Sequence, residues 1–80
     1  MIMDDIQKEI ESLTARIDGG ESSDAVYFER GKLRWRAGDR AGAQSDYTKA
    51  VAINPESPAA LALQMAKDVE AFYNRDLYNP

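Results

Sequence analysis

A glycine-aspartate pair, Gly38-Asp39, divides an otherwise helical stretch that runs from Asp24 to Ser57. Glycine after a helical run can adopt the left-handed conformation that ends a helix. The Asp39 carboxylate can then accept hydrogen bonds from the free backbone N–H groups at the start of the next helix. Asn54-Pro55 ends that second segment, because proline disfavours a helical conformation in the residue before it. The stretch therefore predicts two antiparallel helices joined by a tight turn.

Gly31 lies in the middle of the first of these helices. Glycine at such a position costs roughly 1 kcal/mol relative to alanine, so its presence is best explained by the close approach of another backbone. Ala43 on the second helix is the natural counterpart. Tyr27 and Tyr47 would fill the space beside this contact, and Ala43, Tyr47 and Ala50 share one helical face.

This pattern resembles the tetratricopeptide repeat (TPR) family, whose unit is a helix–turn–helix of about 34 residues. The matching positions, in chain order, are Tyr27, Gly31, Gly38, Asp39, Ala43, Tyr47, Ala50 and Pro55. The chain departs from the family at Arg30, where leucine is favoured, and at Arg34, where tyrosine is favoured. The resemblance implies a protein-interaction or scaffolding module that is not an enzyme and needs no cofactor.

One further helix is predicted on each side of this repeat. Before it, an apolar stripe at spacings of three and four predicts a helix ended by Gly19-Gly20 and packed on the repeat; its members are Ile2, Ile6, Ile10, Leu13 and Ile17. After it, Ser57 as N-cap and Pro58 at the first helical position predict a new helix start. The stripe of that last helix consists of Leu61, Met65, Val69 and Phe72, with Tyr73 at its border.

We therefore expect an all-α chain that forms a TPR-like, right-handed antiparallel array of four helices, at about residues 2–18, 23–37, 40–53 and 58–75. Residues 1–80 form one domain in this interpretation. It comprises an N-terminal half-repeat helix in residues 1–20, a full repeat in 24–57, a capping helix in 58–76 and a tail in 77–80.

The composition excludes several kinds of chemistry. The 80 residues include no cysteine and no histidine, which removes disulfides, thiol nucleophiles, the commonest general base and the usual metal ligands. We expect no metal site, and we interpret the carboxylate pairs Asp4/Asp5 and Asp68/Asp76 as solvated surface groups. No signal-peptide pattern or membrane-length apolar run is present, so we expect a cytoplasmic protein without membrane contact.

Charge is unevenly distributed along the chain. Residues 1–29 hold eight acidic and two basic side chains, whereas residues 30–49 hold six basic and two acidic ones. We do not expect nucleic-acid binding, because the whole chain has a net charge of −4. The opposite charges of the first two helices favour ion pairs from Arg30 and Arg34 to acids such as Glu9 or Asp5. Whether these arginines are instead binding residues stays open.

The candidate binding site is the stripe Phe28, Lys32 and Trp35, with Arg36 beside it. Spacings of four and seven residues place the first three on one helical face. By resemblance to the TPR family, whose first helices line a concave peptide groove, these are groove-facing positions. A tryptophan beside two cations suits an extended segment with a carboxylate and an apolar side chain. The alternative is that Phe28 and Trp35 pack against the first or last helix.

Self-association is an alternative function. Half-repeats at both ends can leave apolar flanks, which a second copy would cover in a two-fold dimer. The isoleucine stripe of residues 2–18 or the stripe from Leu61 to Phe72 would then form a weak homodimer interface. The sequence names no partner and no oligomeric state.

Overall fold

The computed structural model describes the backbone of residues 2–74 and the side chains of residues 4–69. This part of the chain contains four α-helices and no strand. The helices are α1 (Ile2–Asp18), α2 (Asp24–Arg36), α3 (Arg40–Ile53) and α4 (Ala59–Asn74). The predicted all-α class and all four helix ranges are confirmed to within one residue at each end.

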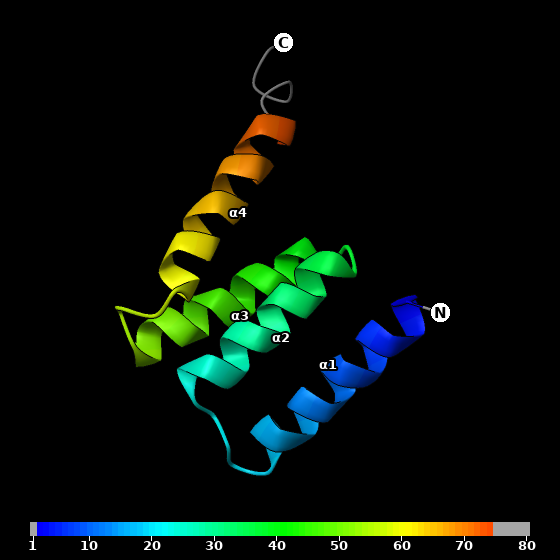
Figure 1. Cartoon of the computed structure of the whole chain (residues 1–80). Coiled ribbons are helices and arrows are strands. Elements are labelled where there is room, and N and C mark those ends of the chain that lie inside the picture. The colour runs from blue at the N-terminus through cyan, green and yellow to red at the C-terminus, as the bar shows by residue number, and fades with distance from the viewer. Residues whose placement is uncertain (1, 75–80) are drawn as a thin grey trace.

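Helices that follow one another in the chain pack together. Figure 1 shows α2 and α3 side by side at the centre, with α1 next to α2 and α4 rising from the end of α3. The α2–α3 pair makes the most extensive contact. This helical hairpin is therefore the framework that positions the two outer helices.

The turn between α2 and α3 forms as its residue types require. Gly38 has a φ of 88°, a left-handed conformation that side chains other than glycine's rarely accept. The Asp39 carboxylate then accepts a hydrogen bond of 2.9 Å from the backbone N–H of Gly42. The predicted turn and N-cap are both confirmed.

Serines cap the starts of α2 and α4. Ser23, rather than Ser22, caps α2, because its Oγ accepts a hydrogen bond of 3.3 Å from the backbone N–H of Val26. The buried Ser57 Oγ accepts one of 3.1 Å from Ala59 at the start of α4. The one-residue difference from the predicted start at Pro58 is within the usual uncertainty of helix ends.

The α2–α3 contact is close at Gly31, as its position predicted. A Cβ added to Gly31 would lie 2.6 Å from Cε1 and 2.8 Å from Cδ1 of Tyr47, and 3.3 Å from the carbonyl oxygen of Ala43. Ala43 and Ala50 are fully buried, and the Tyr47 ring is 4% exposed. The small residues thus let the helices approach while Tyr47 fills the space beside them.

The α1 stripe forms a buried face. Ile6, Ile10 and Leu13 are each no more than 9% exposed, and α1 packs on α2. These three residues are buried, as predicted, whereas Ile17 is only partly buried and the side chain of Ile2 lies outside the described residues.

The apolar stripe predicted on α4 is largely exposed at two of its members. Leu61 is 67% and Met65 is 58% exposed. The face that packs on α3 is instead rich in alanine, with Ala59 and Ala66 buried and Ala62 partly buried. Alanine suits this face because it lets two helix backbones approach closely. The predicted contribution of Phe72 and the tail at 77–80 lie outside the described side chains.

None of the helices in the described part of the chain combines the length and apolar character needed to cross a membrane.

Candidate partner-binding site

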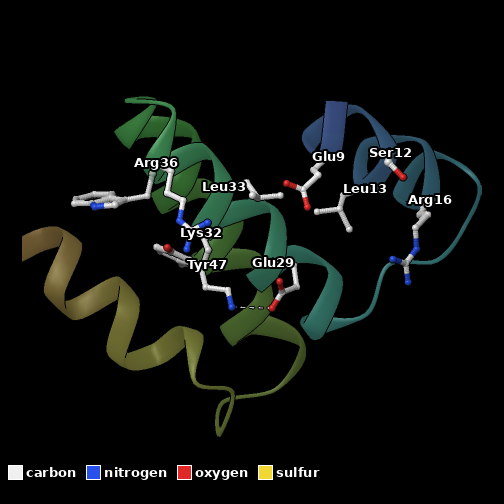
Figure 2. Close-up of a pocket in the computed structure, with 10 residues that line it drawn as sticks. Glu9, Ser12, Leu13, Arg16, Glu29, Lys32, Leu33, Arg36 and Tyr47 are labelled. Atoms are coloured by element: carbon white, nitrogen blue, oxygen red, sulfur yellow. Dashed lines mark ion pairs between the residues drawn. The ribbon is translucent and has the colours of Figure 1, made fainter. Parts of the chain in front are cut away.

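A recess of about 610 Å³ runs across the solvent-facing side of α2. Figure 2 shows α1 along one border, with Leu13 and Leu33 pointing toward each other there, and the charged side chains of α2 along the middle. The residues that line it are Glu9, Ser12, Leu13, Arg16, Glu29, Lys32, Leu33, Trp35, Arg36 and Tyr47. Its volume lies within the range of ordinary ligand sites.

Three of the four predicted site residues line this recess, namely Lys32, Trp35 and Arg36. Phe28 is not among the lining residues. Its ring packs at 6.0 Å between centroids against Tyr47, and the Lys32 ammonium lies 4.6 Å above it. Phe28 therefore contributes indirectly, because its ring holds the Lys32 ammonium through a cation–π contact.

Trp35 combines the two roles that the sequence left as alternatives. Its ring is partly buried against the core cluster that includes Tyr47 and Ala59 of α4, and it also borders the recess. The guanidinium of Arg40 lies 5.5 Å from the ring centroid. The core cluster and the Arg40 guanidinium thus both hold the indole in place, which gives the recess a rigid aromatic edge.

Most charges in and beside the recess are already paired. Lys32 forms an ion pair of 2.8 Å with Glu29 one turn earlier, and Arg16 pairs with Glu21 of the α1–α2 loop. The hydrogen bond from Arg16 holds the pKa of the exposed Glu21 carboxyl below its usual value. Within the described residues, Arg36 has no ion-pair partner. Its guanidinium is therefore the cation most available to an external carboxylate.

Arg30 and Arg34 form a buried ion cluster with Asp46 of α3, not with the acids of α1. Arg30 donates to both Asp46 oxygens, from Nε at 2.9 Å and from Nη2 at 2.8 Å, and Arg34 Nη1 donates at 3.2 Å. Asp46 is fully buried. The predicted pairing with Glu9 or Asp5 is wrong, because both arginines pair with Asp46 and the hydrogen bond from α1 to this cluster comes from the Thr14 hydroxyl, 3.1 Å from Arg30.

The hydrogen bond to Asp46 raises the pKa of the Arg30 guanidinium above its already high value. Arg30 thus stays charged at any pH at which the chain is folded. Arg30 and Arg34, two of the six basic side chains in residues 30–49, thus form ion pairs within the fold. Both guanidinium groups donate hydrogen bonds to Asp46.

Sequence reasoning missed Asp46 as the partner of the arginines, and it missed Leu13 and Leu33 as residues that line the recess. Asp46 precedes Tyr47 on the inner face of α3, between Ala43 and Ala50. A carboxylate on a face otherwise made of core residues was the signal that could have identified it as the partner of the inward arginines. Leu13 and Leu33 gave no signal, since each also fits an ordinary core position.

The carboxylate pairs make no site in the described part of the chain. Asp4, Asp5 and Asp68 are exposed, and Asp68 accepts a hydrogen bond of 3.0 Å from Gln64. Asp76 lies outside the described residues. No group of three or more acidic side chains there is placed to hold a metal ion.

No protein-family model, curated protein or solved structure matches this chain at a significant level.

Proposed function

We propose that this chain is a non-enzymatic interaction module of TPR type that binds a peptide or protein partner through the recess on α2. The observation that carries the proposal is the recess itself, which Lys32, Trp35 and Arg36 line together with Leu13 and Leu33. The close Gly31 contact and the Gly38-Asp39 turn support the TPR-like arrangement of the helical hairpin.

The recess suits a short segment that carries both an apolar and an acidic side chain. Leu33 offers partly exposed apolar surface in it, and Trp35 is an aromatic residue of the kind that dominates binding energy at interfaces. The Arg36 guanidinium can form a two-pronged hydrogen bond with a carboxylate. Because the recess is shallow and spans a single repeat, we expect affinities in the micromolar range or weaker.

The experiment is a selection of random displayed peptides on the wild-type protein, with removal of those that also bind an Arg36→Glu variant. Arg36 is exposed, so the variant should fold normally. Selected peptides are then titrated while the fluorescence of Trp35 is followed, which is unambiguous because the chain has a single tryptophan.

Lys8→Glu is the matched control, since it makes the same charge change on an exposed α1 residue that does not line the recess. We expect peptide binding to change the Trp35 emission and to be weakened at least tenfold by Arg36→Glu but not by Lys8→Glu. Equal weakening by both variants, or selected peptides that leave the emission unchanged, would show that the recess is not the binding site.

A further inference from the structure

Glu9 of α1 lines the recess with an exposed carboxylate. Within residues 4–69, whose side chains the structure describes, it forms no ion pair and no side-chain hydrogen bond. The other charged groups of the recess, Arg36 apart, are paired within the chain, Lys32 with Glu29 and Arg16 with Glu21. The recess therefore presents one open carboxylate and one open guanidinium, and the two lie on different helices.

The packing of α1 on α2 brings Glu9 and Arg36 to the same end of the recess. The two helices run in opposite directions (Figure 1), and Leu13 and Leu33 point toward each other between them (Figure 2). Glu9 lies about one turn before Leu13 on α1, and Arg36 lies about one turn after Leu33 on α2. Because the helix directions are opposite, both steps lead toward the same end.

An apolar side chain separates these two charges. Figure 2 shows the Glu9 carboxylate pointing toward Leu33, with Arg36 on the other side of that leucine. Leu33 is partly exposed, so a bound side chain can contact it. The site thus consists of an acid, an apolar contact and a base, and its complement is a segment with a base, an apolar side chain and an acid.

A segment whose charged side chains are all acidic fits this arrangement less well. The acid that meets Arg36 would lie at the same end of the recess as the Glu9 carboxylate, and juxtaposed like charges disfavour binding. A purely basic segment would meet the same opposition at Arg36. Complementary charges at an interface fix the register of the partner and reject wrong partners.

On the basis of the function proposed above, we infer that the partner segment carries charges of both signs. An acidic side chain pairs with Arg36, a basic side chain pairs with Glu9, and an apolar side chain between them contacts Leu33. Glu9 is then a specificity-determining residue that selects against purely acidic segments.

The displayed peptides selected on the wild type test this composition directly. We expect the enriched peptides to carry a lysine or arginine and an apolar residue in addition to their acidic residue. In a synthetic peptide of this kind, replacement of the base by glutamine should weaken binding to the wild type about threefold or more. The same replacement should have no effect on binding to a Glu9→Gln variant.

Charge reversal gives a second measurement. Glu9→Lys should weaken binding of the selected peptide about fivefold or more, because a repulsion replaces an attraction. Glu11→Lys is the matched control, since it makes the same charge change on an exposed α1 residue that does not line the recess. A double variant, Glu9→Arg with Arg36→Glu, should prefer a peptide in which the acid and the base are exchanged. All three positions are exposed, so helix content should match that of the wild type.

The outcomes distinguish the role of Glu9 from the function on which it rests. Enrichment of acidic residues alone, or equal effects of Glu9→Lys and Glu11→Lys, would overturn the role of Glu9 and leave binding at Arg36 intact. Tighter peptide binding by Glu9→Gln would also overturn it, because Glu9 would then compete with the partner for Arg36. Peptides that bind equally well to Arg36→Glu would overturn both the role of Glu9 and the proposed function.

Discussion

Replacement of Asp46 by asparagine tests the buried ion cluster between α2 and α3. Asparagine keeps the size of the side chain and removes its charge, so Arg30 loses its counter-ion and Arg34 keeps only the longer ion pair of 4.0 Å with Asp39, while the packing is retained. Asp46 is fully buried, and the Arg30 side chain is only 8% exposed. Loss of one partner of a buried ion pair destabilises proteins by about 3–5 kcal/mol.

The structure places this variant at the lower end of that range. Arg34 is 26% exposed and can turn toward water, and Arg30 keeps its hydrogen bond to the Thr14 hydroxyl. We therefore expect a loss of about 3 kcal/mol, which is a large part of the stability of a domain of this size. The corresponding drop in melting temperature is about 12–24 °C.

Thermal and urea unfolding followed by circular dichroism and Trp35 fluorescence measure the effect. Asp68→Asn is the matched control, because Asp68 is exposed and should change stability by less than about 0.5 kcal/mol. A triple variant with leucine at Arg30, Arg34 and Asp46 should recover most of the loss, since apolar replacement of a whole buried ion cluster is often neutral or stabilising. A melting temperature for Asp46→Asn within about 4 °C of the wild type would refute the reasoning.

Three further perturbations test the helical hairpin. Gly31→Ala should lower the free energy of unfolding by about 1 kcal/mol, although alanine favours helices, because the new Cβ would overlap the buried Tyr47 ring. Unfolding in urea measures this loss, and an unchanged midpoint would contradict the close contact. Burial, and secondarily the nearby Asp46 charge, raises the pKa of the Tyr47 hydroxyl, so folding favours its protonated form and stability should decline as pH rises above about 10. Tyr47→Phe should reduce this alkaline decline in melting curves recorded between about pH 8 and 11; an equal decline in both proteins would exclude Tyr47 as its source. Ser23→Ala should lower the free energy of unfolding by about 0.5–1 kcal/mol, and with it the melting temperature, through loss of the α2 cap. Ser22→Ala should leave the melting temperature unchanged.

The helices and turns could be predicted from the sequence because their signals are local. Gly38 and Asp39 end one helix and cap the next through their own backbone conformation and side chain, whatever packs around them. Gly31 also predicted a long-range contact, since a glycine inside a helix lowers stability unless a neighbouring element needs the space that a side chain would occupy. The predictions that failed concern which partner a side chain meets.

The correction on α2 has a physical cause. The opposite net charges of two helices favoured pairing of Arg30 with acids of α1, yet a single carboxylate inside the hairpin, Asp46, lies closer. Desolvation explains why Arg30 pairs with Asp46. A buried guanidinium requires a counter-ion at hydrogen-bond distance, and the net charge of a neighbouring helix does not supply one.

On α4, the sequence identified the stripe that contains Leu61 and Met65 but not the alanine face, Ala59 and Ala66, that the structure buries. Close helix packing depends on how near the backbones can come, and alanine permits a shorter distance than leucine or methionine. The same rule made Gly31 informative on α2. Small residues therefore mark where α3 packs on α2 and on α4, whereas Leu61 and Met65 remain exposed.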